Sequence, residues 1–186
     1  MPVLIALLRG VNIGGHHKIK MDLLREICVS LKCENPQTLL QSGNLVFKAS
    51  SNVAKLADSL ESAIERKLGF RPSVLLRTAP EMREIIARNP FGTRKGINPS
   101  KLVVAFLAAE PNAQARKELH AMDIAPEELH AIGRELYIYF PNGQARPKLS
   151  WQRVDKILGS CAPGTARNWN TVTKLLQLAE GLEASA

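Results

Sequence analysis

The motifs that usually identify an enzymatic reaction are absent from this sequence of 186 residues. His16 and His17 are adjacent, and no second pair of histidines stands at the spacing that zinc sites use. There is no Ser-His-Asp arrangement, no nucleophile elbow and no close pair of carboxylates in a catalytic motif. The sequence therefore predicts no metal and no cofactor, and any catalytic residue is unknown.

Cysteine is scarce, and long hydrophobic runs are absent. Cys28, Cys33 and Cys161 are odd in number and form no C-x-x-C pair, which favours a reduced, cytoplasmic protein. Cys28 falls on the apolar face of an expected helix, where a free thiol behaves as a small hydrophobic group. The longest apolar run, residues 102–109, is too short to cross a bilayer. Residues 1–8 lack a basic leader, so we expect neither a membrane partner nor a signal peptide.

Charge is the strongest compositional signal. The hydrophobic and charged fractions, 45% and 23%, are typical of a soluble globular protein. The net charge is +8, and residues 1–99 hold 15 Lys and Arg against 8 Asp and Glu. Residues 134–174 hold 7 against 2. This excess favours a nucleotide, a nucleic acid or a small anionic ligand as partner, although a merely solvated basic surface explains it equally well. Oligomeric state is left open.

The first half of the chain reads as β-α-β-β-α-β, the ferredoxin-like order. The apolar run 3–8 predicts a buried central strand, and Ser42-Gly43 predicts a turn between two short strands. Helices are expected at 22–33 and 53–68, and Ser51 or Asn52 is the expected cap of the second. The other strands are expected at 38–40, 45–47 and 73–77. A connecting helix follows and begins with a capping box formed by Thr78 and Glu81.

The second half repeats this order of elements. Strands are expected at 102–107, 128–132 and 135–140, and helices at 112–122 and 149–158. The fourth strand must lie in 160–166, a poor strand sequence because of Pro163 and Gly164, and a last helix at 170–180 is expected to stop at Gly181. We therefore expect an α+β fold of two tandem ferredoxin-like halves, residues 1–90 and 101–186, joined by a linker at 91–100. The second half ends in an extra C-terminal helix.

Three polar segments lie beside these apolar runs and are the best functional lead. The first polar segment, Arg9–Gly15, joins a strand to a helix. Its glycines let backbone N–H groups face a ligand, and Lys18 or Lys20 adds charge, so the segment is a candidate anion cradle. The glycine spacing matches neither common nucleotide-binding loop, and a plain strand-to-helix turn is the alternative.

The second polar segment, Gln41–Asn44, offers amides and a hydroxyl at the end of a sheet. Gln41, Ser42 and Asn44 are candidates for hydrogen bonds to a ligand. Ser-Gly is also common turn chemistry, and Asn44 can bond its own backbone, so a structural role is the favoured alternative.

The third polar segment, Arg167–Thr171, places one aromatic residue among polar ones. Arg167 suits a bidentate contact with phosphate or carboxylate, and Trp169 suits stacking on a base. The alternative is that Asn170 caps a helix and Trp169 is buried. Arg146 and Lys148 follow a Pro-Asn-Gly turn and are candidates for the same basic surface.

The stretches 6–15, 18–21, 41–47, 134–143 and 167–175 together resemble a bacterial family named for a domain of unknown function, number 1697. The resemblance runs in order from the first strand to the last helix and implies an α+β protein. It implies no activity, cofactor or partner. One departure is that Pro147 stands before Lys148 where the family usually has Ser, which weakens a ligand role for this loop.

Our leading hypothesis is a binding module for a phosphate-bearing ligand in a basic cleft between the two halves. The alternatives are a small-molecule enzyme that uses the same cleft and a structural or interaction protein without a ligand. The expected ligand-binding residues share polar or flexible character and come from the three polar segments and the basic residues near them. They are Arg9, Asn12, Gly14, Gly15, Lys18, Lys20, Gln41, Ser42, Asn44, Lys148, Arg167, Asn168, Trp169 and Asn170.

Overall fold

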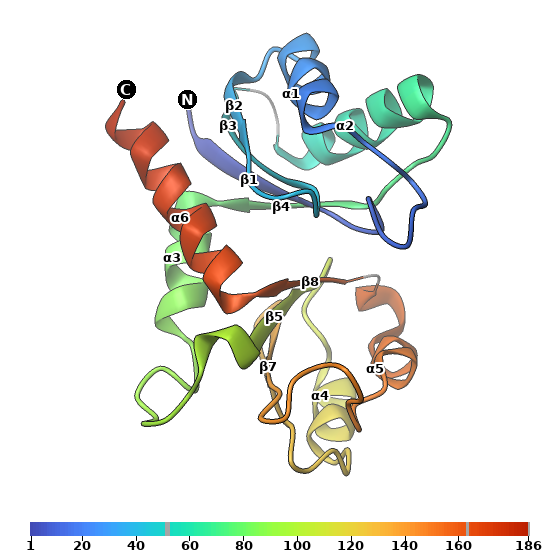
Figure 1. Ribbon diagram of the computed structural model, residues 1–186, viewed down its shortest axis with the longest axis vertical. Helices are drawn as coiled ribbons and strands as arrows, with labels where there is room; N and C mark the ends of the chain where they lie inside the picture. Colours follow the sequence, from blue (N-terminus) through green and yellow to red (C-terminus); the bar gives the residue numbers. More distant parts are fainter. Residues whose placement is uncertain (51–52, 163, 186) are drawn as a thin grey trace. The chain divides into compact units, whose positions relative to one another are not determined.

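The computed structural model describes residues 1–50, 53–162 and 164–185, and its strands form two four-stranded antiparallel sheets (Figure 1). By their contacts the residues divide into unit 1, Met1–Arg83 with Lys174–Ala186, and unit 2, Glu84–Thr173. Both divisions of the chain fall inside helices, α3 (Ala79–Ala87) and α6 (Trp169–Ala184). The cap expected at Ser51 or Asn52, and Pro163, lie outside the described residues.

Unit 1 builds one sheet in the order β2-β3-β1-β4. Its elements are β1 (Val3–Leu8), α1 (Met21–Ser30), β2 (Glu34–Thr38), β3 (Asn44–Lys48), α2 (Val53–Leu68), β4 (Val74–Thr78) and the start of α3. Every residue of β1 is buried, which confirms the central strand predicted from the apolar run. Strand β1 is central because β3 and β4 both pair with it in antiparallel register.

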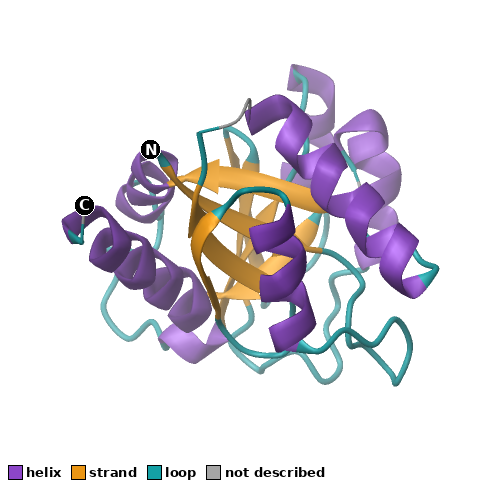
Figure 2. Ribbon diagram, turned by 90° about the horizontal axis from the view of Figure 1, so that it is seen from above, coloured by secondary structure: helices purple, strands orange, loops and turns teal. Residues whose placement is uncertain are grey.

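The core of unit 1 lies between its sheet and the helices α1 and α2. Alternate residues of β1, among them Leu4 and Leu8, face this core because side chains alternate along a strand. Leu24 and Ile27 of α1 and Leu60 of α2 meet them from the other side. Figure 2 colours the strands orange and the helices purple. This packing fixes the loop between β1 and α1 at one end of the sheet.

Unit 2 repeats the arrangement with the order β6-β7-β5-β8. Its elements are the 3-10 turn η1 (Pro99–Lys101), β5 (Leu102–Phe106), α4 (Ala113–His120), β6 (Glu128–Ile132), β7 (Glu135–Tyr139), α5 (Trp151–Leu158), the 3-10 turn η2 (Gly159–Cys161) and β8 (Thr165–Asn168). Leu119 of α4, Val154 of α5 and Ile138 of β7 belong to its hydrophobic core. The two tandem ferredoxin-like halves are thus confirmed, with a C-terminal helix after the second.

Several boundaries differ from the sequence-based expectation, among them the end of the helix expected at 22–33, which stops at Ser30, and three of the others have a clear local reason. Strand β2 covers 34–38 rather than 38–40, because Leu40 has a left-handed φ of +60° and already belongs to the turn. The fourth strand of unit 2 begins at Thr165, past Gly164, and pairs with β5. Helix α6 continues through Gly181, where a glycine costs only about 1 kcal/mol relative to alanine, and the next residue, Leu182, is buried.

The capping box at the start of α3 is confirmed. The hydroxyl of Thr78 accepts a 3.2 Å hydrogen bond from the backbone of Glu81, and the Glu81 carboxylate accepts a 2.7 Å bond from the backbone of Thr78. The division of the chain into residues 1–90 and 101–186 with a linker at 91–100 stays a prediction. No helix in the described part of the chain is long and apolar enough to cross a membrane.

Candidate functional site

The first and second polar segments meet at an open cavity of about 700 Å³ in unit 1. Its wall comes from the loop between β1 and α1, the first turn of α1, the turn after β2 and the end of α2. The lining residues are Asn12, Gly15, Lys18, Ile19, Lys20, Leu23, Gln41 and Leu68. Five of these eight were predicted as ligand-binding residues from the sequence, and they come from two segments more than twenty residues apart.

Asn12 holds this wall together. Its side-chain oxygen accepts a 2.9 Å hydrogen bond from the backbone of Ile19, and its Nδ2 donates to the Ile19 carbonyl at 3.1 Å. The same Nδ2 donates to the carbonyl of Gln41 at 2.6 Å. The φ of Asn12 is +56°, a conformation that asparagine tolerates better than most residues. Asn12 therefore closes the loop 12–19 on itself and joins it to the second polar segment.

His17 fixes the remainder of this loop. Its carbonyl accepts a 3.1 Å hydrogen bond from the backbone of Asn12, and its Nδ1 lies 3.2 Å from the carbonyl of Gly10. The ring stacks on Phe70, with 4.6 Å between ring centroids. At the tip of the loop Ile13 is 67% exposed. No pattern in the sequence pointed to this role of His17, because its aromatic partner Phe70 lies beyond α2.

The two cavity lysines are positioned by the entry into α1. Lys18 and Lys20 are exposed, and neither takes part in an ion pair within the described part of the chain. Lys20 is the N-cap residue of α1 and makes no side-chain capping hydrogen bond. The first backbone N–H groups of a helix have no acceptor inside it and carry partial positive charge. The first turn of α1 and two lysines thus lie at one wall of the cavity.

Other predicted residues of the first two segments lie outside the cavity lining. Asn44 is fully buried, and its Nδ2 donates to the carbonyl of Leu39 at 2.8 Å and to the hydroxyl of Ser42 at 2.9 Å. Arg9 is half-buried, and its backbone N–H donates to the carbonyl of Ser73 at 2.9 Å. Gly14 is exposed with a φ of +58°. Arg9, Gly14, Ser42 and Asn44 are not among the residues that line the cavity.

The third polar segment lies in unit 2, where Arg167 on β8 is buried. Its guanidinium donates to the hydroxyl of Thr165 at 2.7 Å and to the carbonyl of Ala166 at 2.9 Å. Burial lowers the pKa of Arg167 to about 10. A second buried arginine, Arg77, has the corresponding position on β4 and donates to the carbonyl of Leu76. A cleft that this segment shares with the first two stays a prediction.

The end of the third segment opens α6. Asn168 precedes the helix, and its Oδ1 accepts a 3.0 Å hydrogen bond from the backbone of Asn170, while its Nδ2 donates to the carbonyl of Ser100 at 2.7 Å. Asn168 is therefore the N-cap, and the alternative that Asn170 caps the helix is wrong. Trp169 is half-buried, and Asn170 is exposed.

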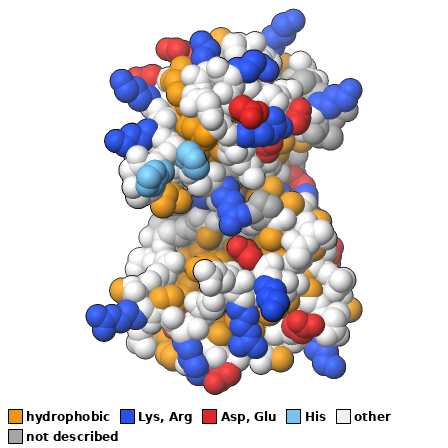
Figure 3. All heavy atoms as spheres, turned by 90° about the vertical axis from the view of Figure 1, so that its right-hand side faces the viewer, with side chains coloured by type: hydrophobic (Ala, Val, Ile, Leu, Met, Phe, Trp, Pro, Cys, Tyr) orange, Lys and Arg blue, Asp and Glu red, His pale blue; other side chains and the backbone are white. Residues whose placement is uncertain are grey.

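Lys148 is tied to acidic neighbours of unit 2. Its ammonium pairs with Asp123 at 2.9 Å. Its backbone N–H and that of Leu149 donate to the buried carboxylate of Glu127 at 3.1 Å. These bonds use only the backbone groups of the loop. Lys and Arg side chains are spread over the face shown in Figure 3, with Asp and Glu between them.

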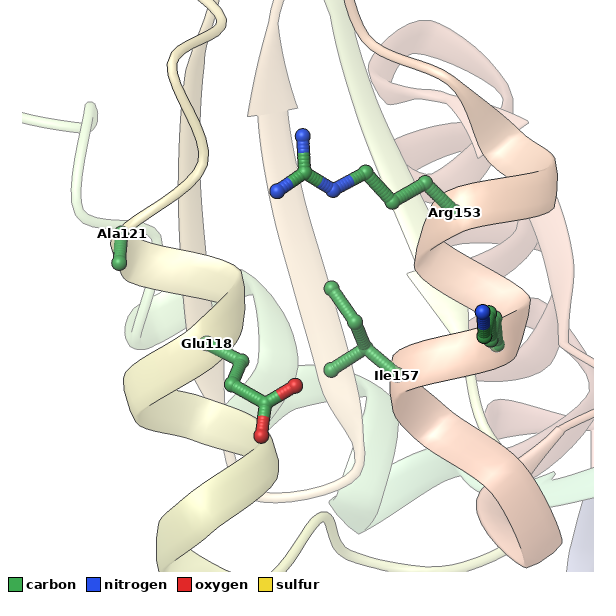
Figure 4. A pocket seen from close by; sticks show the side chains of 5 residues that line it. Glu118, Ala121, Arg153 and Ile157 are labelled. Atoms are coloured by element: carbon green, nitrogen blue, oxygen red, sulfur yellow. The ribbon is translucent and has the colours of Figure 1, made fainter.

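A second cavity, of about 520 Å³, lies between α4 and α5 of unit 2. Glu118 points into it from α4, and Arg153 and Ile157 point into it from α5 (Figure 4). Lys156 and Ala121 complete its lining. The sequence did not point to this cavity, because single charged residues on two helices look like ordinary solvated faces. Among the described residues, no group of three His, Cys, Asp or Glu could hold a metal ion.

Comparison with known proteins supports the fold and identifies the family. A solved structure described as that of the conserved bacterial protein SP0830 from Streptococcus pneumoniae superposes with a TM-score of 0.71. The alignment covers 97% of this chain and 99% of that one at 20% sequence identity, which shows a common fold.

Sequence comparison is more specific. A search of curated protein sequences finds no match to the chain. A family model described as "Protein of unknown function (DUF1697)" matches residues 1–137, which include the first and second polar segments and the whole cavity of unit 1. The resemblance found in the sequence is confirmed, and the chain belongs to this family.

Proposed function

We propose that the unit 1 cavity binds a small phosphate-bearing molecule, and specifically a mononucleotide. The observation that carries the proposal is that two separate polar segments meet at one cavity of about 700 Å³. Cavities of this size accommodate a small organic ligand, and they typically combine apolar walls with a few polar groups.

The phosphate end of the ligand is assigned to Lys18, Lys20 and the first turn of α1. Phosphate is favoured at a helix N-terminus because free N–H groups and the helix dipole both attract negative charge. Both lysines are exposed and line the cavity, so they approach a phosphate without first breaking an ion pair of the described chain. Gly15, with a φ of +81°, leaves the loop backbone without a side chain on that wall.

The base of the nucleotide is assigned to the apolar part of the cavity. Ile19, Leu23 and Leu68 supply aliphatic surface, against which a planar base buries its faces. Gln41 is exposed at the rim, and its side-chain amide offers both a donor and an acceptor to the edge of a base. Asn12 acts through the loop, since its amide already bonds Ile19 and Gln41.

Titration with ADP that carries a methylanthraniloyl fluorophore on its ribose tests the proposal. We expect saturable binding that weakens as salt is raised, because the lysine–phosphate attraction is screened. Lys18→Ala and Lys20→Ala should each weaken binding about tenfold, equivalent to roughly 1.4 kcal/mol. Lys55→Ala is the matched control, because Lys55 is an exposed lysine of unit 1 outside the cavity lining, and it should leave affinity unchanged.

Two competitors distinguish the neighbouring possibilities. Unlabelled ADP should displace the probe at much lower concentration than inorganic phosphate, because the base contributes contacts of its own. Binding of a single-stranded oligonucleotide without binding of ADP would overturn the mononucleotide and favour nucleic acid instead. If neither ADP nor the oligonucleotide binds to protein that circular dichroism shows to be folded, the cavity is not a phosphate site.

A further inference from the structure

The end of helix α1 brings two cysteines together. Lys32 has a left-handed φ of +62°, and its N–H donates to the carbonyl of Val29 at 2.9 Å. The N–H of Cys33 donates to the carbonyl of Cys28 at 3.1 Å. These two hydrogen bonds define a Schellman motif, which places the side chains of Cys28 and Cys33 against each other. The way in which α1 ends therefore brings the two cysteines together, although four residues separate them in the sequence.

Both thiols are free and lie in the core of unit 1. Cys28 is fully buried, and Cys33 is 4% exposed. A hydrogen bond from the Cys28 thiol to the Cys33 sulfur, with burial and the charge of Cys33, raises the pKa of Cys28. The same hydrogen bond lowers the pKa of Cys33, although burial opposes it. Cys33 is thus the more acidic of the two thiols, because the hydrogen bond from Cys28 favours its ionised form.

We propose that Cys28 and Cys33 form an oxidisable dithiol, which a hydroperoxide converts to an intramolecular disulfide. The backbone geometry allows this bond. A disulfide needs Cα atoms within about 7 Å, and the bond lengths together with the trigonal angles at the amide nitrogen and the carbonyl carbon, along a 3.1 Å N–H to carbonyl contact, keep the two Cα atoms inside that limit. The inference does not depend on the ligand proposed for the cavity.

The chemistry balances in two steps. The Cys33 thiolate attacks one oxygen of hydrogen peroxide, the O–O bond breaks, and Cys33 becomes a sulfenic acid as hydroxide leaves. The Cys28 sulfur then attacks the Cys33 sulfur, the S–O bond breaks, and water leaves with the Cys28 proton. The two sulfurs together lose two electrons, and the peroxide is reduced to water.

The competing explanation is that the two thiols only pack. A Schellman motif usually has an apolar contact at these two positions, and a pair of small apolar side chains would serve equally well. Packing alone predicts that oxidation is no faster for this pair than for the third cysteine. Cys161 is half-buried in unit 2 and provides that comparison.

Peptide mapping of peroxide-treated protein tests the proposal directly. Trypsin cleaves after Arg25, Lys32 and Lys48, so it separates Cys28 from Cys33. After oxidation and alkylation without reductant, we expect peptides 26–32 and 33–48 to remain joined and to separate with dithiothreitol. The intact protein should lose roughly 2 Da, the mass of two hydrogens, and a maleimide in denaturant should label one thiol where it labelled three.

Single variants assign the roles. Cys28→Ala should abolish the linked peptides and leave a sulfenic acid on Cys33 that dimedone traps. Cys33→Ala should abolish both products, and Cys161→Ala should leave the disulfide intact. The proposal fails if all three cysteines of folded wild-type protein remain reduced thiols after peroxide treatment, so that maleimide still labels all three. It also fails if the linked peptides contain Cys161. Unfolded wild-type protein in urea should form the disulfide more slowly, which separates a preformed pair from chance encounter.

Discussion

The side-chain amide of Asn12 donates a 2.6 Å hydrogen bond to the carbonyl of Gln41, and this bond joins the first polar segment to the second. Asn12 makes two further bonds to the backbone of Ile19. The cavity of unit 1 therefore has its shape because one amide spans two loops. Asn12 positions the lining residues, while Lys18 and Lys20 remain available to a ligand.

Asn12→Ala should destabilise unit 1 and disturb the cavity together. The change removes three side-chain hydrogen bonds, each contributing roughly 1 kcal/mol net, and places alanine at a φ of +56°. We expect the free energy of unfolding in urea to fall by about 2–4 kcal/mol. Asn12→Gly is the control, because glycine adopts this φ freely and reports the loss of the hydrogen bonds alone. An Asn12→Ala protein within experimental error of wild type would contradict a structural role for this amide.

Gly43→Ala should be strongly destabilising, because there is no room for a side chain. A Cβ at this position would lie 2.5 Å from Cγ2 of Val11 and 2.8 Å from Cβ of Leu8. Overpacking of this kind costs about 1–3 kcal/mol, and a φ of +74° adds roughly 1–2 kcal/mol for an L residue. Thermal unfolding should show the loss as a lower Tm.

Gly69→Ala separates the two causes. Gly69 also has a φ of +74°, but no atom of the described chain, its immediate neighbours excepted, lies within 4 Å of a Cβ built there. It should show the φ penalty alone, about 1–2 kcal/mol. Equal losses for Gly43→Ala and Gly69→Ala would mean that Leu8 and Val11 move aside without penalty, and that the close approach is unimportant.

Much of the fold was predictable because its signals are local. The apolar run 3–8 identified β1, and the capping box of Thr78 and Glu81 identified the start of α3. The order of strands and helices then left few topologies. Strand β8 was harder to place, because Thr165–Asn168 has little strand propensity and is held by pairing with β5. Non-local pairing of that kind leaves no periodic signal in the sequence.

The sequence pointed to the segments that form the site, but it did not show what each residue in them does. Glycine, amide and lysine content pointed to the loops that form the cavity of unit 1. It did not distinguish Gln41, which lines the cavity, from Asn44, which is buried and bonded within its own turn. The three apolar lining residues, Ile19, Leu23 and Leu68, look like ordinary core positions in the sequence, because the cavity lies at the edge of the helix–sheet core.

The start of α6 provides a paired test of a capping role. Asn168→Ala removes the acceptor for the Asn170 N–H and the donor to the Ser100 carbonyl, so we expect a loss of about 1–2 kcal/mol. Asn170→Ala changes an exposed side chain inside the first turn and should stay within about 0.5 kcal/mol of wild type. Denaturant unfolding measures both. The reverse order of the two losses would restore Asn170 as the cap.

Tyr137 should link the stability of unit 2 to alkaline pH. Its buried hydroxyl donates a 2.6 Å hydrogen bond to the carbonyl of Ile85, so Tyr137→Phe should cost about 1–2 kcal/mol at neutral pH.

Burial, with the charge of Glu135, raises the pKa of Tyr137 against a smaller opposing effect of Arg88. An unfolded tyrosine loses its proton near pH 10 while the folded one keeps it, so this stabilisation is complete below about pH 10 and is lost as the pH rises further. Phenylalanine has no such proton, and the difference between wild type and variant in urea unfolding should therefore narrow above about pH 10. A difference that widened with pH would mean that Tyr137 ionises more readily in the folded protein, contrary to its burial.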